Sequence, residues 1–168
     1  FKSTPQFDEE IRSGFLTAHE AAGRGELDGM AETPEGLLAL IILLDQFPRN
    51  LFRGTARAFA TDPMALILAR RARGLNLGAG LGKWHRLFLR LPFVHSENAE
   101  DQDIGVALAH ALDEERSLNS AIEHRDLIRR FGRFPHRNEA LGRDNTKDEE
   151  EYLGTSPKTF GQGGEEEK

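Results

Sequence analysis

The chain of 168 residues has a length typical of one globular domain, and with 38% hydrophobic residues it is too apolar to be fully disordered. It has no cysteine, which excludes disulfides, thiolate metal ligands and a cysteine nucleophile. Much of the net charge of −6 lies in residues 144–168, where eight acidic residues against three lysines give −5, leaving −1 for residues 1–143. A nearly neutral body argues against nucleic acid as a partner.

Helical periodicity recurs along most of the chain and is interrupted by caps, glycines and prolines. The first three expected helices cover residues 7–22, 34–47 and 62–74. The second begins at Thr33 and Pro34 and is ended by Pro48, and residues 49–61 form a polar connector with one short turn at 55–59.

The remaining expected helices cover residues 81–91, a segment capped by Ser96 or Asn98 that reaches Leu112, residues 117–131, and residues 147–153. Pro92 follows the first of these and Gly132 ends the third. The spacing of Thr146 and Glu149 predicts a capping box at the start of the last helix.

No segment shows the alternating pattern of a strand, so the sequence predicts an all-α fold of antiparallel helix pairs. We expect one domain over residues 1–153, followed by a mobile, acidic, glycine-rich tail over residues 154–168. The longest apolar run, residues 37–44, is far shorter than the roughly 20 residues that span a bilayer, so we predict a cytoplasmic protein without a membrane partner.

Asp45 stands out because it lies one turn after Ile41 in a helix that is apolar on all sides. A buried carboxylate needs a charged or hydrogen-bonding partner, so we predict that an Arg or a His of this chain binds Asp45. Arg49 is one candidate partner, and a base from another segment is the other. Such a pair is either a structural lock at a helix corner or part of a site.

Two histidines allow the same two interpretations. His95 precedes Glu97 just after an apolar stretch, where it either packs at the start of a helix or belongs to a site. His124 lies between Ala121 and Ile128 on the buried side of its helix, where it is either a core histidine or a site histidine oriented by Asp45 or Glu97.

Charged and imidazole groups at the ends of buried helices are desolvated, and they gain most when they contact one another. We therefore predict that residues 45–57, 93–97 and 133–138 converge around His124.

The sequence also resembles the family catalogued as domain of unknown function 924. The resemblance rests on the blocks LLDQFPRN (43–50), RGTARAFATDP (53–63), LPFVHSE (91–97), HRD (124–126), GRFPHRN (132–138), LGR (141–143) and FGQ (160–162). It implies an all-α fold similar to tetratricopeptide-repeat proteins, and it supplies no established activity, substrate or cofactor.

The first functional hypothesis is a site for a small anionic ligand, because arginine binds carboxylates and phosphates and the body is rich in it. The candidate catalytic residues are His124, His95 and Asp45. The candidate ligand-binding residues are Arg49, Asn50, Arg53, Arg57, Glu97, Arg133, His136 and Arg137. If the site is catalytic, we expect His124 or His95 to be the general base and an arginine to stabilise an oxyanion. Hydrolysis is the least demanding reaction, because the sequence has no cofactor motif.

The alternative is a tetratricopeptide-like scaffold that binds a peptide or a second copy of the chain. That function predicts side chains spread over one exposed face, whereas the polar groups here gather at helix ends and connectors. A metal site made of Asp45, His95, Glu97, His124 or His136 is disfavoured by the absence of i, i+4 ligand spacing, so no metal or cofactor is predicted.

Overall fold

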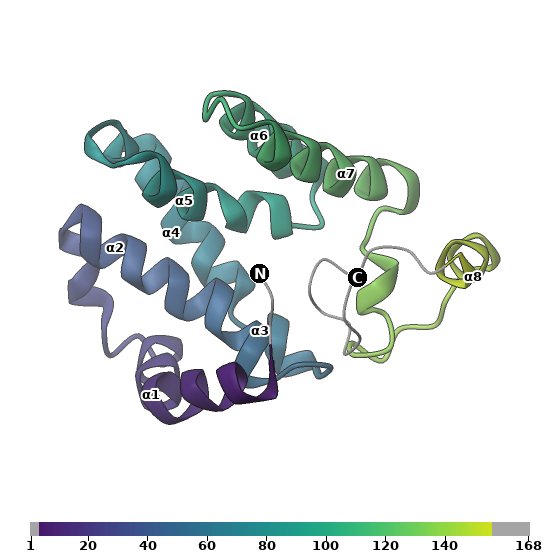
Figure 1. Cartoon of the computed structure of the whole chain (residues 1–168), viewed down its shortest axis with the longest axis horizontal. Coiled ribbons are helices and arrows are strands. Elements are labelled where there is room, and N and C mark those ends of the chain that lie inside the picture. The colour runs from purple at the N-terminus through teal and green to yellow at the C-terminus, as the bar shows by residue number, and fades with distance from the viewer. Residues whose placement is uncertain (1–3, 156–168) are drawn as a thin grey trace.

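Helices make up most of residues 4–155, the part of the chain that the computed structural model describes (Figure 1). The α-helices are α1 (Pro5–Gly23), α2 (Pro34–Ile41), α3 (Phe47–Leu51), α4 (Asp62–Gly74), α5 (Lys83–His95), α6 (Ala99–His110), α7 (Glu115–Phe131) and α8 (Lys147–Gly154). Shorter helical turns are η1 (Asp28–Glu32), η2 (Ile42–Gln46), η3 (Ala56–Phe59), η4 (Leu77–Gly80) and η5 (Pro135–Arg137). Residues 4–155 contain no strand, which confirms the predicted all-α fold.

Capping interactions in the structure lie at several of the predicted helix boundaries. Thr33 caps α2, and Asn98 caps α6 by accepting hydrogen bonds from two backbone N–H groups. Thr146 forms the predicted capping box with Glu149. Gly132 ends α7 with a φ of 71°, a left-handed conformation that glycine adopts without strain.

Two helix ends differ from the prediction. Pro92 does not follow α5 but lies inside it, and the helix continues to His95; a proline near the C-terminal end removes only one backbone donor. α7 begins two residues before Ser117, because the carboxylate of Glu114 accepts the Ser117 N–H and caps the helix. The predicted acidic tail lies outside the described residues from position 156 onward.

The prediction that Pro48 ends the second helix is also wrong. The chain passes from α2 into η2, a π-helical turn, and then into α3, where Pro48 occupies the first turn. In the π-helical turn the Phe47 N–H donates to the carbonyl of Ile42, five residues earlier. Proline is tolerated at that position because its missing N–H falls at the start of a helix.

Side chains from other segments satisfy the carbonyls that this turn leaves without a backbone donor. The usual donor to the Leu43 carbonyl is Phe47, which donates to Ile42 instead, and the usual donor to the Leu44 carbonyl is Pro48, which has no N–H. His19 Nδ1 lies 2.9 Å from the Leu43 carbonyl, and the hydroxyl of Thr61 donates to the Leu44 carbonyl at 2.6 Å. Helices α1 and α4 therefore hold the π-helical turn in place.

The core lies where α2 packs against α4 and α5, with fully buried side chains such as Leu37, Leu40, Ile41 and Phe93. Helices α4, α5 and α6 each pack against the next helix in the chain, as the predicted helix pairs require. Gly105 permits a close approach of α6 to α5, since a Cβ there would meet Val94 Cγ2 at 3.0 Å. The likeness to tetratricopeptide repeats stays a prediction.

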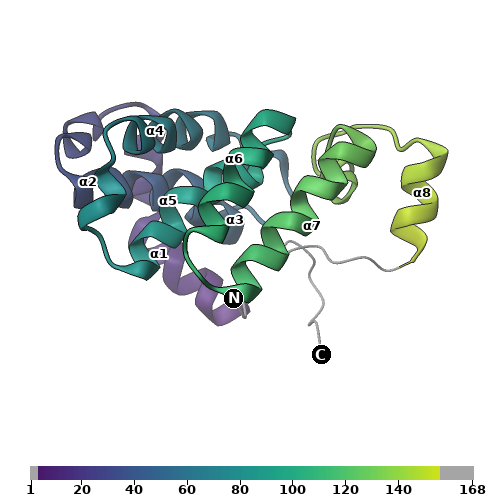
Figure 2. The same ribbon diagram turned by 90° about the horizontal axis from the view of Figure 1, so that it is seen from above.

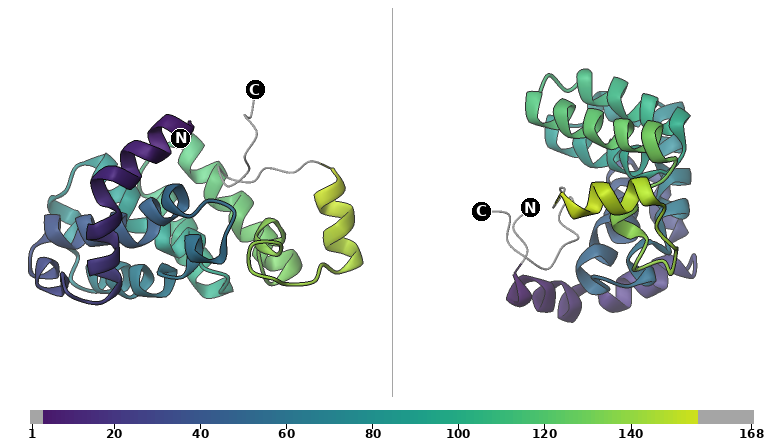
Figure 3. Two further views of the ribbon diagram at one scale, coloured as in Figure 1. Left: turned by 90° about the horizontal axis from the view of Figure 1, so that it is seen from below. Right: turned by 90° about the vertical axis from the view of Figure 1, so that its right-hand side faces the viewer.

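α8 stands at one end of the molecule, beyond α7, and contacts the turn η5 (Figures 2 and 3). It is fastened there by Arg133, whose guanidinium binds the Glu149 carboxylate through two hydrogen bonds of 2.7 Å. None of the described helices is long and apolar enough to cross a membrane.

Candidate functional site

Asp45 lies in the π-helical turn η2, and its side chain has no exposed surface. Its Oδ1 atom lies 2.7 Å from Nδ1 of His95, the last residue of α5, and 3.6 Å from Nη2 of Arg49. The side-chain amide of Gln46 donates to the second carboxylate oxygen. The prediction that Asp45 is buried and bound by an Arg or a His is confirmed, and the structure shows both partners.

A second carboxylate, Asp62 at the start of α4, joins two arginines. Arg49 binds both its oxygens, at 2.9 and 3.0 Å, and Nη1 of Arg137 lies 3.7 Å from Oδ2. Arg137 also donates to the backbone carbonyl of His95 at 3.1 Å, and its guanidinium lies 4.4 Å from the centre of the Phe134 ring. Sequence reasoning missed Asp62, because an aspartate before proline at a helix start has an ordinary structural explanation.

Three imidazole rings gather beside these ion pairs. The ring centres of His95 and His124 are 6.2 Å apart, and Phe134 lies between His124 and His136, at 5.6 and 5.5 Å from their centres. The Ser120 carbonyl can only accept a hydrogen bond, so His124 carries its proton on Nδ1, 2.7 Å away. We name this set of side chains the histidine cluster: Asp45, Arg49, Asp62, His95, His124, His136 and Arg137.

Burial dominates the protonation of the cluster. It lowers the pKa of His124 to about 3, with the neighbouring His95 and Arg137 adding to the effect, and it lowers that of His136 to about 3 as well. Burial also lowers the pKa of His95, against the pull of the Asp45 carboxylate. Although burial acts to raise the pKa of Asp45, the charges of its basic neighbours outweigh it and keep this carboxylate ionised.

The segment around residue 134 is held against the end of α5 by Glu97. The Glu97 carboxylate accepts the Phe134 N–H at 2.8 Å and binds Arg143 at 2.7 and 3.0 Å. Arg143 in turn donates to the Phe134 carbonyl at 3.1 Å. The structure thus brings residues 45–49, 95–97 and 134–137 together around His124.

Three of the predicted ligand-binding residues lie elsewhere. Asn50 and Arg53 both bind Asp8 of α1, at 2.8 and 3.0 Å, and Arg57 stacks 3.9 Å from the centre of the Phe52 ring. They line a groove of about 770 Å³ between α1 and residues 50–57. The prediction that the whole segment 45–57 converges on His124 is therefore wrong beyond Arg49, because successive helical residues turn away from the cluster to face α1.

Arg133 is also outside the cluster, since its guanidinium binds Glu149 of α8. This hydrogen-bonded pairing lowers the pKa of Glu149 to about 2. Within residues 4–155, no three histidine, aspartate or glutamate side chains are placed to hold a metal ion together.

These features define an all-α protein in which an aspartate–histidine pair is buried among arginines and further imidazoles. The chain belongs to the family of bacterial proteins of unknown function DUF924, whose model matches residues 1–156. Its structure is similar to the solved structure of a protein of unknown function from Agrobacterium tumefaciens, with a TM-score of 0.87 and 45% sequence identity. The comparison covers 91% of this chain and 86% of that one. No curated protein sequence matches the chain significantly.

Proposed function

We propose that the histidine cluster binds a small anionic ester and hydrolyses it, with His95 as the general base. The observation that carries this proposal is the bond of 2.7 Å between Asp45 and Nδ1 of His95. An ionised carboxylate on Nδ1 keeps the proton there, leaves the lone pair on Nε2, and stabilises the imidazolium that forms when Nε2 takes a proton.

In the proposed step, Nε2 of His95 takes one proton from a water molecule while the water oxygen forms a bond to the acyl carbon of the ester. The tetrahedral intermediate then expels the alcohol, which receives the proton back from the imidazolium. His124 is a weaker choice as base, because burial lowers its pKa to about 3, which gives little driving force for proton transfer.

Arg137 is the proposed anion-binding group. Burial lowers its pKa to about 10, so it stays charged at neutral pH, and its buried Nε–H has no hydrogen-bond acceptor among the described residues. A guanidinium donor of this kind binds a carboxylate or stabilises a developing oxyanion.

The test compares hydrolysis of the anionic ester p-nitrophenyl hemisuccinate with that of the neutral p-nitrophenyl acetate. We expect the anionic ester to be preferred, with a rate that falls in acid as His95 becomes protonated, at a pH below the ordinary pKa of histidine because burial lowers the pKa of His95. His95→Gln removes the base and lowers the rate by about 100-fold or more, whereas His110→Gln, at an exposed position on α6, leaves it unchanged. Equal rates for the wild type and His95→Gln would contradict the proposal.

One observation favours the alternative function, a scaffold that binds a peptide. Large apolar side chains are exposed at Ile67, Leu75 and Trp84, with Trp84 68% exposed. Trp84 is the single tryptophan, so its fluorescence reports directly on a peptide that covers it. A blue shift on adding an apolar peptide, without any ester hydrolysis, supports the scaffold. A cytoplasmic location stays a prediction.

A further inference from the structure

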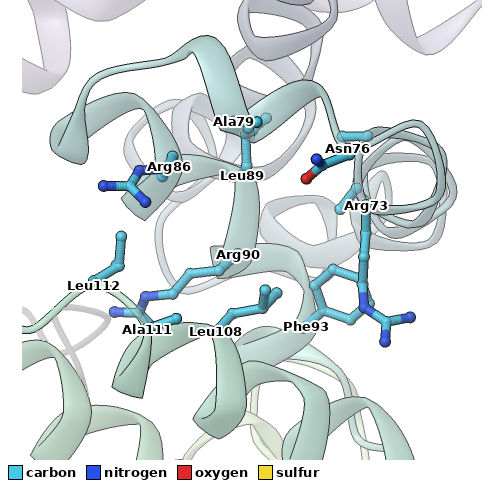
Figure 4. A pocket seen from close by; sticks show the side chains of 13 residues that line it. Arg73, Asn76, Ala79, Arg86, Leu89, Arg90, Phe93, Leu108, Ala111 and Leu112 are labelled. Atoms are coloured by element: carbon cyan, nitrogen blue, oxygen red, sulfur yellow. The ribbon is translucent and has the colours of Figure 1, made fainter.

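A separate pocket lies between α4, η4, α5 and the end of α6 (Figure 4). Its volume is about 220 Å³, and its walls are mostly apolar, with Ala69, Leu89, Phe93 and Leu108 among them. No residue of the histidine cluster lines it. The pocket therefore has its own chemistry, which does not depend on the function proposed above.

Arg90 of α5 brings a positive charge into this apolar pocket. Its side chain is only 4% exposed, and Figure 4 shows the guanidinium lying across the pocket beside Ala111 and Leu112. Nη2 donates to the hydroxyl of Ser117, but the buried Nε and Nη1 atoms have no hydrogen-bond partner. Buried donors without acceptors are costly, so the two free donors of Arg90 point to an acceptor that arrives from outside the chain.

The charges around Arg90 favour an anion. Arg86 lies on the same side of the pocket in Figure 4, and Arg73 lines it across from them, beyond Phe93. Among the described residues that line the pocket there is no acidic side chain. The carboxylate that acts on Arg90 most strongly is that of Glu114, which is outside the lining and accepts the Ser117 N–H as a helix cap. Burial lowers the pKa of Arg90 to about 10, which leaves it charged at neutral pH.

We propose that this pocket binds a small aromatic monocarboxylate, with its carboxylate on Arg90 and its ring among the apolar side chains. The parallel donor pairs of a guanidinium are Nε with Nη2 and Nη1 with Nη2, so a planar carboxylate accepts from one idle donor of Arg90 and from the N–H of Nη2 that does not bind Ser117. A dry apolar cavity of about 150 Å³ is known to hold benzene, so 220 Å³ accommodates a benzene ring with one carboxylate attached. A free phosphate would satisfy Arg90 but leave the apolar walls uncovered.

The experiment is calorimetric titration of the full chain with benzoate. Three probes separate the contributions: benzyl alcohol has the ring without the charge, acetate has the charge without the ring, and inorganic phosphate is a different anion. We expect benzoate to bind at least tenfold more tightly than each of them. No heat with benzoate up to about 10 mM, or equal binding of benzoate and benzyl alcohol, would overturn the proposal.

Variants then locate the site. Arg90→Met lowers benzoate affinity at least tenfold, whereas Arg129→Gln, an exposed arginine on α7 paired with Asp103, leaves it unchanged. Ala111→Leu keeps the charge but narrows the pocket, so it weakens benzoate binding even if Arg90→Met does not fold. His95→Gln retains full benzoate binding, which separates this proposal from the hydrolytic one. Benzoate binding that survives both pocket variants, or is lost in His95→Gln, places the anion elsewhere and refutes the proposal.

Discussion

The histidine cluster and the Arg90 pocket both bury arginine side chains, but they surround them differently. In the cluster, Arg49 binds one carboxylate bidentately and contacts a second, so its charge is matched within the chain. In the pocket, Arg90 has one hydroxyl partner and two idle donors next to empty space. A matched buried charge fixes one arrangement of the fold, whereas an unmatched one next to a cavity indicates a ligand.

The sharpest test of this contrast is Asp45→Ala. Removal of this carboxylate leaves Arg49 and His95 buried beside a missing partner, and we expect a loss of about 3–5 kcal/mol in the free energy of unfolding. Urea denaturation at pH 7 measures it, with Asp126→Ala at an exposed position as the control. A loss below about 1 kcal/mol would mean that the ion pairs of the cluster contribute little to the fold.

Acid should lower the free energy of unfolding because it protonates the buried His124. Its pKa falls from 6.5 to about 3 on folding, so its contribution is complete above pH 6.5 and is lost as the pH falls toward 3. The loss is about 5 kcal/mol at most. In His124→Gln, the free energy of unfolding declines less steeply between pH 6.5 and 3 than in the wild type. His110→Gln serves as the control, and an unchanged slope in His124→Gln would contradict the expectation.

Arg53→Ala should cost much less, because its partner Asp8 lies near the surface. Both side chains are about one-fifth exposed, and pairs of this kind contribute about 1 kcal/mol or less. A double-mutant cycle with Asp8→Ala measures the coupling. We also expect ester hydrolysis to be unaffected, and a loss of activity in Arg53→Ala would restore Arg53 to the list of ligand-binding residues.

The smallest effect is expected for Arg90→Met. Methionine fills a similar space and removes a desolvated charge, while Ser117 loses one hydrogen bond, so the two contributions offset each other to within about 1 kcal/mol. Thermal unfolding in the absence of any carboxylate measures the change. A loss above about 3 kcal/mol would show that Arg90 is a structural residue, like Arg49.

Much of the histidine cluster could be predicted, because polar groups at the ends of buried helices are desolvated and are stabilised by contact with one another. Helical spacing predicts the burial of Asp45 and His124, and the apolar stretch before His95 marks that residue as a candidate. The expectation of contact was wrong for Asn50, Arg53 and Arg57, because their direction depends on the position of α1, which the sequence of residues 45–57 does not contain.

Arg90 could not be found in this way. Helix α5 carries Arg86 and Arg90 one turn apart, which is the pattern of an ordinary solvent-facing stripe. Only the positions of α6 and of the turn η4 show that Arg90 is covered. Asp62 was missed for a related reason, since its ionic partners are distant in the sequence. Arg49 precedes it by 13 residues, and Arg137 follows it by 75.

The π-helical turn η2 has a consequence for how this chain can change over generations. A turn of this kind holds one more residue than an α-helical turn, so it behaves as a single-residue insertion that the helix has absorbed. Deletion of one residue there would restore regular α-helical spacing, and the helix on either side would keep its direction because the turn has already absorbed the extra residue. A deletion in a regular stretch of α2 would instead rotate every following residue by about 100°. The π-helical turn is thus a place where this helix can lose a residue without turning α3, and with it Arg49, away from Asp62.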